Sequence, residues 1–163
     1  GELIGKHRIT GMTAFSKESF SKQFRVPGLV VFRASHEGKV VGMLLWFIQG
    51  DVAYYHLGSS SSVGYELHAS FAMFFSAIEH FAEDGRLRWL DLGAGAGIRG
   101  DGTDGLSRFK RGWSTGTRTA YFCGRVLNSE RYVEIEQSKG VSGTDYFPIY
   151  RRGEFGEVEE QDR

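Results

Sequence analysis

The stretch that decides the fold is Val52-Ala53-Tyr54-Tyr55-His56-Leu57-Gly58-Ser59-Ser60-Ser61-Ser62-Val63-Gly64. Residues 52–57 have the aromatic and β-branched character of a strand. Residues 58–64 are small and include no acid, and an amphipathic run begins at Tyr65. The first N–H groups of a helix lack an internal partner, and the helix dipole favours negative charge there. The stretch therefore predicts an anion site, and the alternative is a serine-rich turn that only caps the helix. Its predicted ligands are Gly58, Ser59, Ser60, Ser61, Ser62 and Gly64.

The amphipathic run predicts a helix over residues 65–83, followed by a second strand. Asp84-Gly85 ends the helix, and residues 87–92 predict the strand. A strand, a helix and a strand in one sheet form a right-handed crossover, so residues 52–57 and 87–92 should run parallel. The apolar residues recur at helical spacing and are expected to form the buried face. They are Leu67, Phe71, Phe74, Phe75, Ile78, Phe81 and Ala82.

The N-terminal part of the chain predicts a helix and two more strands. Residues 16–24 predict the helix, which Pro27-Gly28 ends. Strands at 29–34 and 40–48, joined by a turn at 35–38, lead into the strand at 52–57 as an antiparallel meander. Because the 40–48 run is apolar almost throughout, it should be central in the sheet. The fold class is therefore α/β (α+β), with a mixed sheet in which a β-α-β crossover follows an antiparallel meander.

Shorter elements are predicted after the crossover. They are a glycine-rich loop at 93–105, a basic helical turn at 105–113, a strand at 118–127 and a helix at 129–137. Tyr121 and Val126 flank Cys123 on the predicted strand, so we expect a buried, structural cysteine. Residues 1–153 would form a single domain, and residues 154–163 an acidic, flexible tail.

The composition restricts the class of protein. The chain has 163 residues, with 20 Lys and Arg against 20 Asp and Glu, so its net charge is zero. A neutral total gives no support for DNA binding through bulk charge. No apolar run approaches the ~20 residues needed to span a bilayer. The single cysteine suits a reducing compartment, which predicts a cytoplasmic location. Because the chain begins with Gly1-Glu2 rather than Met, we expect a fragment or a processed form.

The run Leu90-Asp91-Leu92-Gly93-Ala94-Gly95-Ala96-Gly97 matches the first motif of methyltransferases that use S-adenosylmethionine. Its surroundings do not fit that fold. Residues 98–105 are polar and glycine-rich where a long helix is needed, and residues 115–124 contain no acid for the ribose. The remaining chain is too short for several further strand-helix units. A methyltransferase therefore remains only as an alternative function.

The order of meander, small-residue loop, long helix and parallel strand resembles the core of the GNAT acyltransferase fold. In that fold two neighbouring strands splay apart, and acyl-coenzyme A lies between them with its pyrophosphate at the helix N-terminus. Residues 52–57 and 87–92 would be the splayed strands. The resemblance implies acyl-coenzyme A as the donor. The sequence contains no H-x-x-x-H pair or other metal-ligand spacing, so we expect no metal.

Finer motifs resemble the Fem-like branch of these acyltransferases. In that branch a D-x-G strand end precedes a G-L-x-x-F-K-x-x-[FW] turn, as Leu90-Asp91-Leu92-Gly93 precedes Gly105-Leu106-Ser107-Arg108-Phe109-Lys110-Arg111-Gly112-Trp113 here. The branch includes peptidoglycan-bridge peptidyltransferases and proteins of polysaccharide biosynthesis. It implies aminoacyl-tRNA as an alternative donor and a peptidoglycan or polysaccharide precursor as an alternative acceptor to a small amine. It also implies that the chain is the C-terminal half of a tandem pair; a homodimer is the other arrangement.

Two residues are the catalytic candidates and two are candidates for holding the cofactor. His56 has an intrinsic pKa suited to taking a proton from an amine, although it could be an ordinary strand histidine. Asp91 could orient or deprotonate the acceptor, or pair with Arg88 or Lys110. Arg108 and Lys110 offer the positive charge that phosphate or carboxylate recognition needs, or form a solvated basic turn.

The predicted function is transfer of an acyl or aminoacyl group to an amine by direct attack. Positioning and backbone N–H groups near the splayed strands would stabilise the oxyanion. Tyr54, Tyr55 and Tyr65 cluster around the small-residue loop and could line an acceptor pocket or pack the sheet. A non-catalytic binding domain with the same fold is the alternative.

Overall fold

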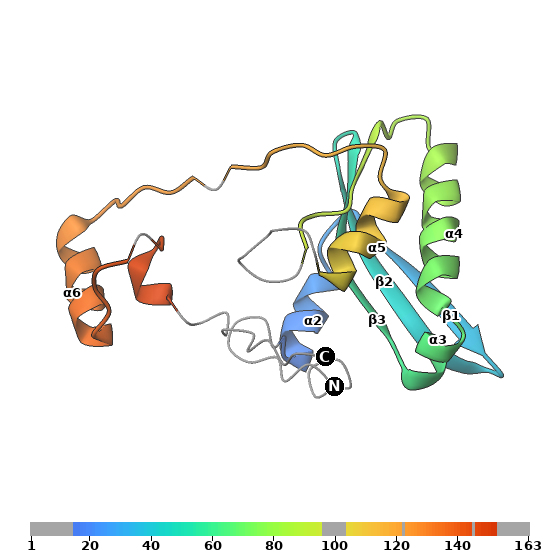
Figure 1. Ribbon diagram of the computed structural model, residues 1–163, viewed down its shortest axis with the longest axis horizontal. Helices are drawn as coiled ribbons and strands as arrows, with labels where there is room; N and C mark the ends of the chain where they lie inside the picture. The colour runs from blue at the N-terminus through green and yellow to red at the C-terminus, as the bar shows by residue number, and fades with distance from the viewer. Residues whose placement is uncertain (1–14, 96–103, 122, 145, 153–163) are drawn as a thin grey trace.

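The structure is a computed structural model that describes residues 15–95, 104–121, 123–144 and 146–152. The predicted tail at 154–163 and much of the predicted glycine-rich loop lie outside these residues. Figure 1 shows the elements in chain order. They are α2 (Lys17–Gln23), β1 (Leu29–His36), β2 (Lys39–Gln49), β3 (Val52–Ser60), α3 (Ser62–Glu66), α4 (Ala69–Glu83), β4 (Trp89–Asp91), α5 (Gly105–Trp113), α6 (Ser129–Lys139) and the short 3-10 helix η2 (Ile149–Arg151).

The described strands form one four-stranded mixed sheet in the order β1-β2-β3-β4. β1, β2 and β3 are antiparallel, and β4 runs parallel to β3. The predicted fold class, the internal position of the apolar strand β2 and the parallel crossover are confirmed. The all-parallel sheet that a methyltransferase requires is absent from the described strands.

The first hairpin is tighter than the sequence predicted. Ser35 and His36 belong to β1 rather than to a turn, and the connection consists of Glu37 and Gly38 alone. Both residues have positive φ angles, of 49° and 75°, as a two-residue hairpin turn requires. The predicted turn at 35–38 was therefore two residues too long. A two-residue turn with positive φ angles matches the twist of the flanking strands, so the strands can pair right up to it.

The small-residue stretch is not the continuous loop that the sequence predicted. Gly58, Ser59 and Ser60 continue β3 and pair with β2. The predicted single helix is also wrong in its first turns, because α3 ends before His68, whose left-handed backbone (φ 51°) separates α3 from α4. The reason is the docking of α3 on β2: a Cβ on Gly64 would lie 2.1 Å from the Val41 carbonyl oxygen. The chain must turn after this contact before α4 can cross the sheet.

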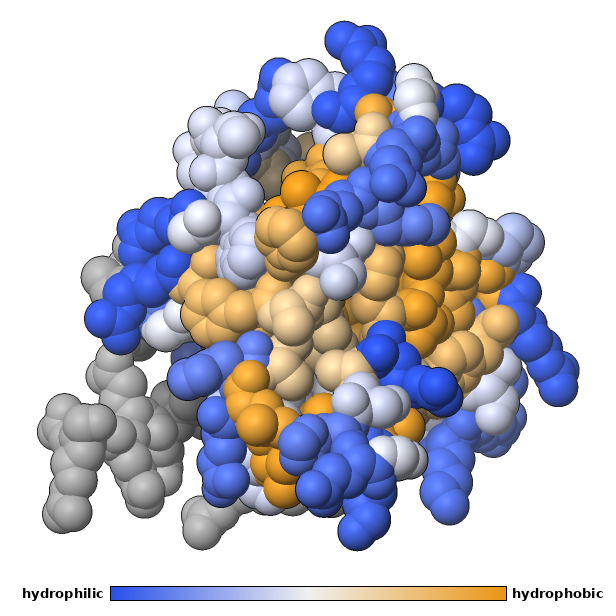
Figure 2. All heavy atoms as spheres, turned by 90° about the vertical axis from the view of Figure 1, so that its right-hand side faces the viewer, coloured by the Kyte–Doolittle hydropathy of each residue, from blue (hydrophilic) through white to orange (hydrophobic). Residues whose placement is uncertain are grey.

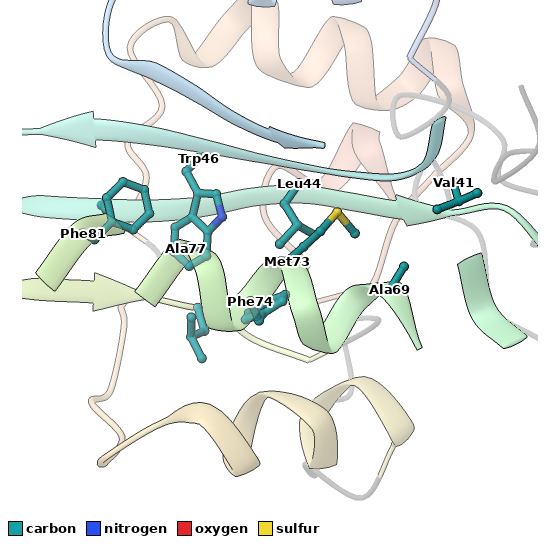
Figure 3. Packing of buried hydrophobic residues seen from close by; sticks show 10 residues of the cluster. Val41, Leu44, Trp46, Ala69, Met73, Phe74, Ala77 and Phe81 are labelled. Carbon is teal, nitrogen blue, oxygen red and sulfur yellow. The ribbon is translucent and has the colours of Figure 1, made fainter. Parts of the chain in front are cut away.

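The core lies between the sheet and α4. Figure 3 shows Leu44 and Trp46 of β2 facing Phe74, Ala77 and Phe81 of α4. The Trp46 ring centroid lies 5.2 Å from that of Phe81 and 5.9 Å from that of Phe74. Trp46 is fully buried. This aromatic cluster fixes the orientation of α4 on the sheet.

The buried face of α4 differs from the predicted one. Phe74 and Phe81 are buried as predicted, but Phe71 is 51% and Phe75 56% exposed, and Leu67 lies before the helix and is exposed. The buried residues are Ala69, Met73, Phe74, Ala77 and Phe81. Small alanines at the contact let the helix backbone approach the sheet, so the larger rings turn to the flanks. Figure 2 shows apolar surface on this outer side of the molecule.

The predicted strand at 118–127 is absent from the described residues of that segment. Tyr121 is 84% and Leu127 90% exposed, and Cys123 is exposed, contrary to the predicted buried cysteine. The physical reason is that this segment forms no ladder with β4, whose only described partner is β3. Figure 1 shows the segment leading away from the sheet to α6, which confirms the predicted C-terminal helix.

We predict that Phe74→Ala lowers the free energy of unfolding by about 3–5 kcal/mol, because it removes a buried ring and leaves a cavity. Phe75→Ala on the same helix should change it by about 0.5 kcal/mol or less, since that ring is half in solvent. Urea denaturation of both variants measures the difference. Equal losses in the two variants would show that the assigned buried face of α4 is wrong.

Candidate functional site

The candidate site lies where β3 and β4 part. The parallel ladder pairs Val52 with Trp89, Ala53 with Leu90 and Tyr54 with Asp91, and then ends. β3 continues to Ser60 with no described strand on that side. The backbone of β3 beyond Tyr54 therefore borders an opening, as the splayed-strand prediction requires.

A β-bulge places His56 at this opening. Trp46 of β2 pairs with Tyr55, but Leu45 pairs with Leu57, so His56 is the inserted residue. A bulge leaves backbone groups outside the ladder and re-aims the side chains around it. The bulge thus places this irregularity of β3 beside the end of the β3–β4 ladder, where the two strands separate.

Tyr55 lies on the α4 side of the sheet. Its ring centroid is 5.3 Å from that of Trp46 and 5.1 Å from that of Phe74. Burial raises the pKa of Tyr55 to about 12, with a smaller contribution from Tyr65. The phenol is therefore neutral at physiological pH and can donate a hydrogen bond. The sequence could name Tyr55 only as a pocket or packing residue, because its neighbours come from three other elements.

Lys110 approaches the opening from α5. Its Nζ lies 5.3 Å from the centroid of the Tyr55 ring and donates a hydrogen bond to the Ala94 carbonyl oxygen at 2.5 Å. Burial lowers the pKa of Lys110, and the charges of Asp91 and Asp104 oppose that shift. The structure thus brings Lys110 to the segment just beyond β4, where the predicted glycine-rich loop begins, and its functional role stays a prediction.

Two aromatic residues hold α5 in place. Phe109 lies 4.9 Å and Trp113 5.8 Å from Phe74, measured between ring centroids. The helix begins at a capping residue, Asp104, whose side chain accepts from the Ser107 amide at 2.9 Å. Arg108, the second predicted basic residue, is exposed and is not brought beside Lys110 in any described contact.

The predicted anion ligands are dispersed over different elements. A Cβ on Gly58 would lie 2.3 Å from the Tyr55 hydroxyl oxygen, so Gly58 makes room for that side chain. Ser61 caps α3: its hydroxyl accepts from the Gly64 amide at 3.1 Å and donates to the Val41 carbonyl oxygen at 3.3 Å. Ser62 begins α3 and is exposed. The Gly64 amide is already satisfied, which is the capping role that the sequence offered as the alternative.

His56 lies on the opposite side of the sheet from Tyr55, beside α2. Its Nε2 lies 2.8 Å from the Gln23 side-chain oxygen, and its ring packs against Phe47 and Phe15 at centroid distances of 5.3 and 6.1 Å. Burial lowers the pKa of His56. The ring is therefore neutral near pH 7 and able to accept a proton.

Asp91 ends β4, and its carboxylate accepts a hydrogen bond from the Gly93 amide at 2.7 Å. It is exposed and forms no described hydrogen bond with His56. Arg88 pairs with Asp51 at 3.9 Å instead, so the predicted Asp91–Arg88 pair is not formed. Asp91 lies near enough to Lys110 to act on its pKa. The two predicted catalytic residues thus lie near one opening but each has its own partner.

Two further findings bear on the chemistry of the site. Within the described ranges, no group of three or more His, Cys, Asp and Glu side chains is arranged to hold a metal ion. The helices of the described part are too short or too polar to cross a bilayer.

Comparisons with known proteins agree with this geometry. The family model of the acetyltransferase (GNAT) domain matches residues 10–111. No curated protein matches the sequence.

Solved structures with a similar fold include an aminoglycoside acetyltransferase from an uncultured soil metagenomic sample. Its complex with sisomicin matches with a TM-score of 0.54, and its complex with trehalose with a TM-score of 0.51. In both cases the sequence identity is 17%, and the match covers 72% of this chain and 80% of the other chain. A third is an aminoglycoside N-acetyltransferase in complex with CoA, with a TM-score of 0.47, 10% identity, and coverage of 77% of this chain and 96% of its own.

We predict that Gly58→Ala lowers the free energy of unfolding by about 1–3 kcal/mol, because the methyl group collides with the Tyr55 hydroxyl. Gly116→Ala is the matched control, since its Cβ would meet nothing within 4 Å. Chemical denaturation measures both. If Gly58→Ala leaves the free energy of unfolding unchanged, Gly58 does not pack against Tyr55 and instead lies in the open loop that the sequence predicted.

Proposed function

The chain belongs to the acetyltransferase (GNAT) domain family, and from this premise we propose that it transfers an acyl group from acyl-coenzyme A to the amino group of a small molecule. The observation that carries the proposal is the opening beyond the Tyr54–Asp91 pair, with the bulge residue His56 at its edge. A thioester placed there would meet the backbone of β3, with which no described strand pairs on that side beyond Tyr54. Backbone N–H donors stabilise the oxyanion that forms on a thioester carbonyl.

Lys110 would serve the donor in this proposal. It is half-buried and held by the Ala94 carbonyl and the Tyr55 ring. A fixed ammonium group attracts phosphate or a developing oxyanion more strongly than a mobile surface lysine does, because less conformational entropy is lost on binding. Arg108, which is exposed on the same helix, would add only a screened attraction. Because the Ser61 hydroxyl and the Gly64 amide are already used in the α3 cap, Gly58, Ser59, Ser60 and Ser62 remain the candidate donor contacts.

His56 would act on the acceptor. An amine attacks only when it is unprotonated, and the neutral His56 ring can take the proton as the new N–C bond forms and the C–S bond breaks. Coenzyme A leaves as a thiolate, which is then protonated. Asp91 would orient the acceptor amine at the end of β4. The two groups would thus bind and deprotonate the acceptor without forming a covalent enzyme intermediate.

The small-molecule acceptor is inferred from fold likeness. The solved structures with TM-scores above 0.5 are of an aminoglycoside acetyltransferase, in one case in complex with sisomicin. This likeness supports a small amine as the acceptor, and membership of the acetyltransferase (GNAT) family supports acyl-coenzyme A as the donor. Location in the cytoplasm, where acyl-coenzyme A is made, is part of the same proposal.

We extend the proposal to the Fem-like branch because of the motif at 105–113. In α5 its Phe109 and Trp113 anchor the helix, and its Lys110 reaches back to Ala94, just beyond the D-x-G strand end. Membership would make aminoacyl-tRNA a second donor and a peptidoglycan or polysaccharide precursor a second acceptor. The zero net charge favours coenzyme A over tRNA. A single domain at 1–153, acting in a tandem pair or as a homodimer, is part of this extension.

We predict that Lys110→Ala weakens acetyl-coenzyme A binding about tenfold or more, the loss expected for one charge-assisted contact. Isothermal titration calorimetry measures the dissociation constant. Lys39→Ala, in the exposed first hairpin, is the control and should bind as the wild type does. Wild-type protein that binds no acetyl-coenzyme A would overturn the proposed donor and leave the non-catalytic binding module or the aminoacyl-tRNA donor; binding of S-adenosylmethionine instead would support the methyltransferase alternative.

We predict that His56→Ala lowers kcat about 10²–10⁴-fold with a small amine acceptor, the usual contribution of a general base. The wild-type rate should fall as the pH drops through the pKa of His56, which burial places below the ordinary 6.5. The rate falls rather than rises at low pH because only the neutral His56 ring can accept a proton. A pH profile of kcat/KM tests it, and an acid limb that survives in His56→Ala would remove His56 from the mechanism.

A further inference from the structure

We propose that Gln23 is a positioning residue that holds His56 in the Nε2–H tautomer and so turns the unprotonated Nδ1 into the base. The inference deepens the proposed function and rests on it for the role of His56. It starts from one contact between α2 and β3, in which the Gln23 side-chain oxygen lies 2.8 Å from Nε2 of His56. No sequence pattern links these residues, which are 33 positions apart.

The contact is built by the packing of α2 on the sheet. Ser16 caps the helix by accepting a hydrogen bond from the Ser19 amide at 3.1 Å, and Gln23 is its last residue. Phe15, just before the cap, packs edge-on against Phe20 and also reaches the His56 ring. The aromatic contacts bring the end of α2 over the bulge. Gln23 is half-buried there, which limits its freedom to turn away.

The direction of the hydrogen bond decides the tautomer. An amide oxygen can only accept, so Nε2 of His56 must carry the hydrogen. A neutral imidazole has one N–H, so Nδ1 then keeps its lone pair. Nδ1 has no hydrogen-bond partner among the described residues. The ring is thus held by one nitrogen and left free to accept a proton at the other.

A neutral partner differs from a carboxylate in this position. An amide fixes the tautomer without adding charge, whereas a carboxylate would stabilise the protonated ring and raise the pKa of His56. Burial lowers the pKa of His56, and no charged group among the described residues raises it. The charged residues on the surrounding elements are Lys17, Glu18 and Lys22 of α2, Arg25 after it, Lys39 at the far end of β2 and Asp91 of β4; Glu18 and Lys22 pair with each other at 2.8 Å.

The test is Gln23→Glu, which keeps the shape and the acceptor but adds the charge. We expect the pKa of His56 to rise by about one unit, the lower end of the effect of an adjacent opposite charge. The acid limb of kcat/KM should move to higher pH by the same amount, with KM for acetyl-coenzyme A unchanged. Ser21→Glu puts the same charge on an exposed position of α2 and should move neither.

Gln23→Leu removes the acceptor while filling the same space. Side-chain 15N NMR of His56 should show the Nε2–H tautomer in the wild type and a mixture in Gln23→Leu, and kcat should fall without a matching change in KM. Circular dichroism checks that both variants fold. If Gln23→Leu does not fold, the isosteric variant Gln23→Glu provides the test.

The NMR measurement needs no substrate, so it separates the two levels of the inference. A His56 ring that carries its hydrogen on Nδ1, or whose tautomer and pKa ignore Gln23→Glu, overturns the positioning role. The NMR signals of His56 could instead respond as expected while the pH profile of the enzyme stays unchanged. That result would support the Gln23–His56 contact but remove His56 as the base, and the proposed function would fail.

Discussion

The packing of Phe74 is the interaction on which the rest of the structure depends. This buried ring contacts Trp46 and Tyr55 of the sheet on one side and Phe109 and Trp113 of α5 on the other. It therefore joins three layers that are remote in sequence. Because interiors are close-packed, a shift of this ring would displace the strand that borders the opening and the helix that delivers the lysine together.

The opening exists because β4 is much shorter than β3. Three residue pairs join them, and beyond Tyr54 no described strand pairs with β3 on that side. A sheet normally avoids unpaired backbone groups, which cost free energy unless water or a ligand satisfies them. The bulge at His56 adds to this departure from a regular ladder. Bulges are over-represented next to active sites, where they re-aim a side chain or end the pairing of strands.

The sequence predicted those features that depend on neighbouring residues. The crossover followed from the apolar period of the helix and the strands around it, and the resemblance to the acetyltransferase (GNAT) family followed from the order of these elements. The basic motif predicted the short helix α5 correctly, whereas the functional role of Lys110 stays a prediction. The ends of elements were less certain: the serines at 59–61 suit a strand, a turn or a cap equally well.

The sequence by itself determined the order of the strands up to β4, the mixed sheet and the family, since hydrophobic periodicity and chain connectivity are local properties. Only the tertiary structure decided which face of α4 is buried, because small residues such as Ala77 set how closely the helix approaches the sheet. It also decided that Tyr55 and His56, adjacent in the chain, lie on opposite sides of the sheet, and that His56 meets Gln23. Those contacts join residues far apart in sequence, and their geometry follows from the packing of whole elements rather than from any local pattern.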